Sequence, residues 1–112
     1  MITIIVAQHF WQRLFGLIGK KSISREEGFF IPRCRRVHTW GMRFPIDVVF
    51  INGSNYVIAV VENLGPWKIS APIKNVWGCL ELKAGGAREH GIVVGSCLVI
   101  SNGRCRVSSA AQ

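Results

Sequence analysis

Acidic residues are scarce in this sequence. Six Asp and Glu stand against 14 Lys and Arg in a chain of 112 residues, so the formal net charge is +8 at pH 7. An excess of positive charge of this size favours contact with phosphate polymers, anionic lipid or acidic proteins. The charge does not choose among these partners, so the other features of the sequence have to do so.

Long apolar runs and an export leader are also missing. No run approaches the roughly 20 residues that a membrane-spanning helix needs, and residues 1–7 carry no positively charged leader. We therefore expect a cytoplasmic protein without a transmembrane segment. Apolar residues make up 49% of the chain and charged residues 18%, which excludes a disordered chain. The length predicts one domain over residues 1–112, with a disordered tail at 108–112.

Cysteine pairs of the C-x-x-C type are absent, which argues against a zinc site or a redox motif. The four cysteines are Cys34, Cys79, Cys97 and Cys105. We predict four reduced thiols, no metal and no cofactor. Cys34 lies next to three arginines that favour its thiolate, so we expect it to react fastest with an alkylating reagent.

Hydrophobic periodicity predicts one helix and several strands. Residues 9–19 repeat apolar side chains at steps of three and four residues, which is typical of an amphipathic helix. After residue 36 the pattern becomes that of strands separated by turns rich in Gly and Asn. The sequence therefore predicts an α+β fold that is mainly β: a partly closed antiparallel sheet or small barrel, with one N-terminal helix and short helical turns.

Two hairpins have a predictable register. The first spans residues 46–61 with a turn around Gly53-Ser54, and the second turns at Asn102-Gly103, a type I′ signal. The predicted opposite pairs are Ile51 with Tyr56, Asp47 with Val60, Ile100 with Cys105, and Cys97 with Ser108. In this register Cys97 and Cys105 are three residues apart along the strands, which is too far for a disulfide.

Several blocks of the chain resemble a known family, and the segment from His38 to Asp47 is the most specific part. The blocks are residues 13–19, Glu27-Gly28, Pro32, Cys34, residues 38–51, Pro66-Trp67-Lys68, residues 80–85 and residues 91–95. In order and spacing, from about residue 10 to 100, they are similar to the domain of unknown function 192. The resemblance implies a compact, mainly β domain with no established reaction. One departure is Gly95-Ser96, where the family usually has Gly-Asp.

Ionisable residues inside apolar, strand-like sequence are the first candidates for a site. The polar cluster predicted to bind a ligand comprises His38, Trp40, Arg43, Asp47, Trp67, Lys68 and Glu81. A structural interpretation competes, because an Asp in a buried strand usually serves as an anchor. We expect Asp47 to be buried and bonded to Arg43, His38 or backbone N–H groups. A third interpretation is a small enzyme that uses Asp47, Glu81 and His38 in acid–base chemistry.

A basic patch precedes and overlaps this cluster. Its cations are Arg33, Arg35, Arg36 and Arg43, which surround an aromatic residue in a composition that surfaces binding single-stranded nucleic acid use. No sequence motif of a known nucleic-acid-binding module accompanies it. We therefore predict a non-catalytic module that binds a small ligand or a protein partner. The small enzyme and a weak electrostatic binder of nucleic acid or another anionic polymer are the alternatives.

Overall fold

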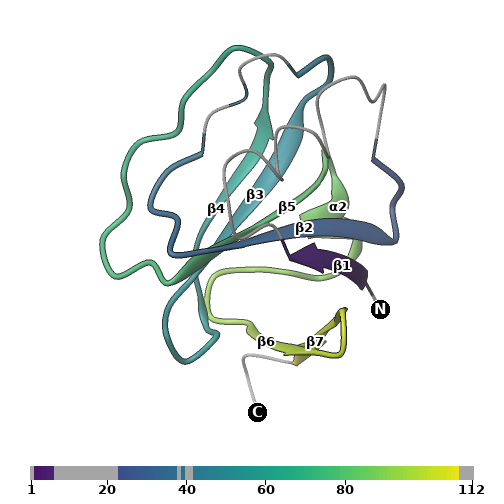
Figure 1. Cartoon of the computed structure of the whole chain (residues 1–112), viewed down its shortest axis with the longest axis vertical. Coiled ribbons are helices and arrows are strands. Elements are labelled where there is room, and N and C mark those ends of the chain that lie inside the picture. The colour runs from purple at the N-terminus through teal and green to yellow at the C-terminus, as the bar shows by residue number, and fades with distance from the viewer. Residues whose placement is uncertain (1, 7–22, 38, 40–41, 109–112) are drawn as a thin grey trace.

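The structure is a computed structural model that describes residues 2–6, 23–37, 39 and 42–108. Seven strands form one sheet in the order β4-β3-β5-β2-β1-β7-β6 (Figure 1). Their bounds are β1 Ile2–Val6, β2 Glu27–Pro32, β3 Ile46–Ile51, β4 Val57–Leu64, β5 Gly78–Lys83, β6 Cys97–Ser101 and β7 Arg104–Ser108. A short helix, α2 (Gly86–Glu89), follows β5.

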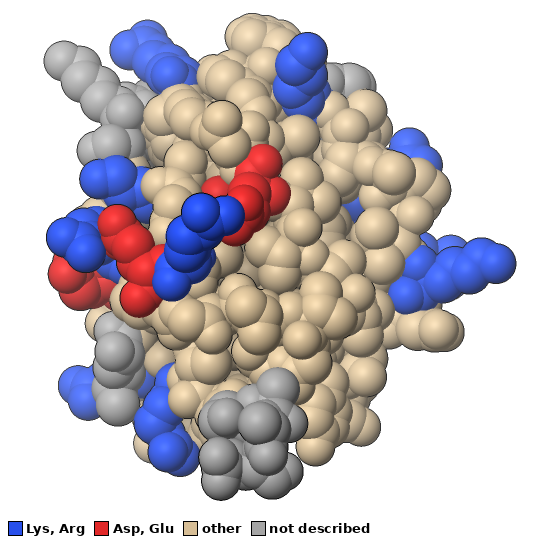
Figure 2. Space-filling model, turned by 180° about the vertical axis from the view of Figure 1, so that it is seen from behind, with Lys and Arg blue, Asp and Glu red and all other residues tan. Residues whose placement is uncertain are grey.

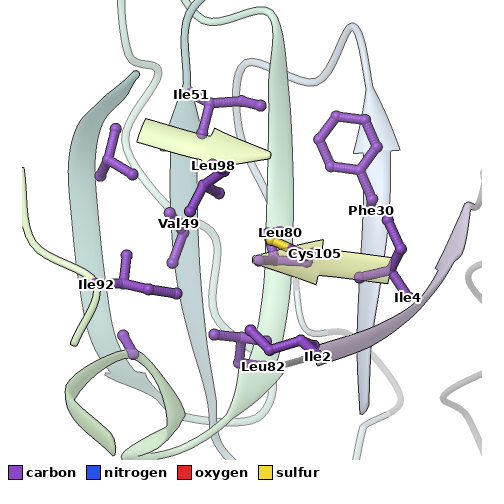
Figure 3. Close-up of a cluster of buried hydrophobic side chains, with 12 residues drawn as sticks. Ile2, Ile4, Phe30, Val49, Ile51, Leu80, Leu82, Ile92, Leu98 and Cys105 are labelled. Atoms are coloured by element: carbon purple, nitrogen blue, oxygen red, sulfur yellow. The ribbon is translucent and has the colours of Figure 1, made fainter. Parts of the chain in front are cut away.

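The strands alternate their side chains between two hydrophobic clusters, one on each face of the sheet. The first cluster holds Ile2, Ile4, Phe30, Val49, Ile51, Val57, Leu80, Leu82, Ala87, Ile92, Leu98 and Cys105, and Figure 3 shows β6 and β7 crossing over it. The second cluster holds Ile23, Phe29, Val37, Met42, Phe44, Ile46, Val48, Phe50 and Cys79. Strand β3 is buried along its whole length because it contributes to both clusters.

The predicted fold class is wrong in three respects. The protein is mainly β, as predicted, but it is not an α+β fold, because α2, with four residues, is the only helix in the part of the chain that the structure describes. The sheet is mixed, because β1 and β2 run parallel. It curls but does not close into a barrel: its edge strands β4 and β6 approach only through an isolated bridge between Tyr56 and Cys97. The N-terminal helix predicted over residues 9–19 lies outside the described residues, so the fold gives it no support.

The C-terminal hairpin has the predicted register, and the first hairpin does not. Ile100 lies opposite Cys105 and Cys97 lies opposite Ser108, which confirms the type I′ prediction. In the β3–β4 pair, by contrast, Ile51 lies opposite Val57 and the register shifts twice along the strands. Each shift inserts a residue without a ladder partner, and such bulges cannot be anticipated from a period of two.

Candidate functional site

Asp47 is an internal anchor. Its side chain is fully buried, as predicted. One carboxylate oxygen accepts the N–H of Asn63 at 2.9 Å, and the other accepts the N–H groups of Gly85 and Ala87, each at 3.0 Å. These are the backbone partners that the sequence allowed for, whereas Arg43 is exposed. Both carboxylate oxygens of Asp47 thus serve backbone N–H groups of the protein itself.

The donors around Asp47 come from places where the chain leaves regular pairing. A register shift between Ile46 and Val48 falls beside Asn63, which has a φ of 53°. The bulge leaves an N–H without a strand partner, and Asp47 accepts it. Gly85, with a φ of 89°, turns the chain into α2, whose first N–H groups also need an acceptor. One carboxylate therefore ties β3 to the bulge in β4 and to α2.

Glu81 faces the opposite side of the sheet. It pairs with Val48 on one side and with Phe29 on the other, and both belong to the second cluster. Asp47 pairs with Leu82, which belongs to the first cluster. Since strands alternate their side chains, the sheet itself separates the two carboxylates. They cannot act on one substrate as an acid–base pair. His38 and Trp40, two further members of the predicted cluster, lie outside the described residues.

The basic segment lies beside the loop that connects β4 to β5, although more than 25 residues of chain separate them (Figure 1). Besides the bond from Trp67 to Thr39 described below, four backbone hydrogen bonds join the two segments in antiparallel order. They are Arg33 N–H to Trp77 O at 2.5 Å, Ile73 N–H to Arg35 O at 3.2 Å, Ser70 N–H to Val37 O at 2.7 Å and Thr39 N–H to Lys68 O at 2.8 Å. This pairing brings the predicted basic patch next to Trp67 and Lys68.

Thr39 fixes the conformation of the loop at Trp67. Its buried hydroxyl donates to Gly65 O at 2.6 Å and accepts the N–H of Lys68 at 2.8 Å, while its carbonyl accepts the N–H of Trp67 at 3.1 Å. Trp67 has a φ of 60°, a region that bulky residues rarely adopt, and 69% of its surface is exposed. The hydrogen bonds of Thr39 thus hold an aromatic residue outward in a strained conformation.

A second aromatic residue is exposed at the other end of the same loop. Trp77 is 38% exposed, and the guanidinium carbon of Arg33 lies 5.8 Å from the centre of its ring. This distance is within the range of a cation–π contact. Arg33 also has a positive φ, 57°, at the turn that follows β2. Both ends of the paired segments therefore present an aromatic ring beside a cation.

We call this region the basic–aromatic surface. Its members are exposed: Arg33, Arg35, Arg36, Arg43, Lys68, Lys74, Trp67 and Trp77. Neither residues 28–46 nor residues 63–80 contain Asp or Glu. Ion pairs in the described part of the chain join Arg25 to Glu89 and Arg88 to Glu62 instead. On the face seen in Figure 2, acidic side chains gather in one band with basic side chains among them, while other Lys and Arg side chains lie around the rim.

Two pockets that are lined by described residues lie away from this surface. One, of about 510 Å³, is open and lined by Val99, Ser101, Asn102, Arg104 and Arg106 on the C-terminal hairpin. Another, of about 410 Å³, lies above Asp47, which remains fully buried beneath it. No group of three His, Cys, Asp or Glu among the described residues could hold a metal ion. In the same part of the chain, no helix is long and apolar enough to cross a membrane.

Sequence reasoning missed two parts of this arrangement. Thr39 was not singled out, although a hydroxyl between apolar residues needs a partner when it is buried. Trp77 and Lys74 are absent from the predicted cluster because nothing in the sequence shows that residues 33–39 pair with residues 68–77.

Ser96, where the family usually has Asp, accepts the N–H of Val93 at 3.0 Å. A side-chain oxygen thus still serves that turn.

The geometry defines a small, mainly β domain with a buried carboxylate anchor and one exposed basic–aromatic surface. Residues 1–100 match the family described as "Uncharacterized ACR" (DUF192), so the chain belongs to this family. The resemblance noted in the sequence is confirmed. A comparison with curated proteins gave no match.

Two crystal structures share the fold. One is a protein from Sinorhizobium meliloti 1021 described as a "putative transcription regulator", with a TM-score of 0.71 and 24% identity over 99% of this chain and 84% of that chain. The other is a protein of unknown function from Novosphingobium aromaticivorans DSM 12444, with a TM-score of 0.72 and 18% identity over 96% of this chain and 75% of that chain. At these identities the likeness shows the fold alone.

Proposed function

We propose that the protein is a non-catalytic binding module whose basic–aromatic surface takes an anionic partner. The observation that carries the proposal is the pairing of two segments, remote in sequence, that together expose five cations and contain no acidic residue, with Arg43, four residues after Thr39, as a sixth cation. Positive charge that no neighbouring carboxylate compensates raises the local concentration of anions. Four of the six cations are arginines, whose planar donors suit phosphate and carboxylate groups.

The exposed tryptophans favour a partner with flat aromatic groups between its charges. Trp67 lies directly beside Lys68, and Ile69, which follows, is 49% exposed. A ring held outward next to cations offers a stacking surface, and single-stranded nucleic acid combines phosphates with unpaired bases. Of the anionic polymers, it is therefore the best first probe.

An enzymatic function has less support. The carboxylate of Asp47 is occupied by three backbone N–H groups, and Glu81 lies on the other side of the sheet. A general base has to reach the proton that it removes, either directly or through one water molecule. Neither Asp47 nor Glu81 is exposed to a substrate in the described surface. A small-ligand site and a protein partner remain the alternatives, and location in the cytoplasm stays a prediction.

Salt-dependent binding tests the proposal. The probe is a fluorescently labelled single-stranded oligonucleotide, titrated with the protein between about 50 and 200 mM salt. We expect affinity to fall steeply with salt and to be insensitive to base sequence. The double variant Arg35→Ala, Arg36→Ala should reduce the slope of log affinity against log salt by about 1.4, because each phosphate contact on a single strand contributes about 0.7.

The matched control changes two arginines elsewhere. Arg104 and Arg106 are exposed on β7, and the double variant Arg104→Ala, Arg106→Ala removes the same charge from the C-terminal hairpin. We expect this control to bind nearly as well as the parent. Equal losses in both double variants would show that net charge, and not the basic–aromatic surface, drives binding. Binding that survives high salt or selects a base sequence would contradict the proposal directly.

A further inference from the structure

Two cysteines that are remote in sequence are in direct contact. The thiol of Cys79 donates to the carbonyl oxygen of Cys34 at 2.9 Å, and the thiol of Cys34 donates to the carbonyl oxygen of Arg36 at 2.8 Å. Cys79 is fully buried in the second cluster, and Cys34 packs against the same cluster while partly exposed. None of the four cysteines forms a disulfide in this structure.

The contact brings the two residues close to disulfide range, so that only a small movement separates them from it. With ordinary bond lengths, a sulfur 2.9 Å from the carbonyl oxygen of Cys34 places the two Cα atoms at most about 8 Å apart. A disulfide requires Cα atoms within about 7 Å. Rotation of the Cys34 side chain away from Arg36 and a small shift of the turn after β2 would join the sulfurs. Cys97 and Cys105 offer no such geometry, since their partners across the hairpin are Ser108 and Ile100.

We propose that Cys34 and Cys79 form a peroxide-sensitive thiol pair. The thiolate of Cys34 attacks hydrogen peroxide, breaks the O–O bond and becomes a sulfenic acid, while hydroxide leaves. The sulfur of Cys79, losing its proton, then attacks the Cys34 sulfur, the S–O bond breaks and water leaves. Two thiols are oxidised to one disulfide and one peroxide is reduced to water. The proposal stands independently of the proposed binding function.

The surroundings suit each cysteine to its step. Of the two, Cys34 is the one that solvent reaches, and it precedes Arg35 and Arg36 in the sequence, whose positive charges would favour the thiolate that attacks peroxide. Cys79 is shielded from solvent, so it reacts only after Cys34 has been oxidised. The bond would close a loop of 45 residues, and it would fix the start of the basic segment to the first residues of β5. A cross-link of this length constrains the unfolded chain.

Mass spectrometry tests the pair. The reduced full-length protein is treated with hydrogen peroxide, unfolded in guanidinium, alkylated and digested. We expect Cys34 and Cys79 to lose alkylation together and to appear in one linked peptide, while Cys97 and Cys105 remain alkylated. The melting temperature of the oxidised protein should rise by several degrees, and a thiol reductant should reverse both changes.

Two variants sharpen the test. Cys34→Ser should leave Cys79 alkylated after peroxide, and Cys97→Ser should behave as the parent does. The proposal is overturned if peroxide carries Cys34 to a sulfinic acid with Cys79 still alkylated. It is also overturned if the linked peptide joins Cys34 to Cys97, or if a non-reducing gel shows that the cross-link joins two chains.

Discussion

The regions around Asp47 and around Trp67 solve the same problem in opposite ways. In both, the chain leaves regular strand pairing, and one side chain, Asp47 or Thr39, accepts or donates the hydrogen bonds that the backbone would otherwise lack. The carboxylate of Asp47 accepts three backbone N–H groups and is buried, so it offers no exposed charge to a ligand. Thr39 instead holds a loop whose cations and tryptophan remain exposed. In this protein, a polar residue within apolar sequence is buried and stabilises irregular backbone by hydrogen bonds. The exposed surface that such a residue stabilises is therefore a better candidate for function than the residue itself.

Removing the Asp47 anchor should have the largest effect. Asp47→Ala leaves three N–H groups without their acceptor, and each unsatisfied buried group costs about 1–3 kcal/mol. We expect a loss of about 3–5 kcal/mol in the free energy of unfolding, measured by urea denaturation. The control is Glu62→Ala, an exposed carboxylate that should change stability by no more than about 0.5 kcal/mol. If Asp47→Ala unfolds at the same urea concentration as the parent, Asp47 does not stabilise the fold.

The pH dependence of stability tests a second buried group. Burial raises the pKa of Cys105 from 9.0 to about 11. As pH rises, the thiol of the unfolded chain ionises before the thiol of the folded protein. The contribution of the buried thiol to the free energy of unfolding is therefore complete below pH 9 and is lost as pH rises through 11. This loss amounts to about 3 kcal/mol at most. We expect Cys105→Ala, although less stable at neutral pH because of the cavity, to show a smaller decline between pH 9 and 11 than the parent. Equal declines would contradict the burial of this thiol.

Thr39→Val tests the support of the basic–aromatic surface with little change in side-chain size. The variant loses the hydroxyl bonds to Gly65 and Lys68, at a cost of about 1–3 kcal/mol. We also expect weaker binding of the single-stranded oligonucleotide, because the loop at Trp67 is no longer fixed. Ser96→Ala, which removes a hydroxyl bond from a distant turn, is the control for binding. If Thr39→Val binds the oligonucleotide as well as the parent does, binding does not depend on the conformation of the loop at Trp67.

Trp67→Gly should have the smallest effect on stability and a clear effect on binding. Glycine adopts a positive φ without strain, which offsets its own entropic cost, so stability should stay within about 1 kcal/mol of the parent. Loss of a stacking ring costs about 1–3 kcal/mol per base in binding. We expect a melting temperature near that of the parent and an oligonucleotide affinity reduced at least fivefold. A marked loss of stability with unchanged affinity would make Trp67 a structural residue.

The sequence predicted the parts of the molecule that depend on local signals. The Asn102-Gly103 turn set the last hairpin correctly, and the apolar residues on both faces of β3 correctly indicated a buried Asp47. The parallel pairing of β1 with β2 could not be predicted, because no turn chemistry joins those strands.

The candidate surface depends on contacts between distant residues. The predicted cluster joined Asp47 and Glu81 because both are acidic residues in apolar strands. Whether they share a face depends on the β3–β5 register. The chain between these two strands contains β4 and a long loop, so no local turn signal fixes that register in the sequence. For the same reason the sequence identified the basic patch but not its pairing with residues 68–77.

The central claim is that ligands bind the basic–aromatic surface and leave the Asp47 anchor alone. The most direct test is a titration of the isotope-labelled protein with the single-stranded oligonucleotide, followed through backbone amide chemical shifts. We predict that the amides of residues 33–37 and 65–77 move with salt-dependent binding, while those of Asn63, Gly85 and Ala87 stay in place. Shifts centred on α2 and the bulge in β4, with residues 65–77 unchanged, would contradict the account.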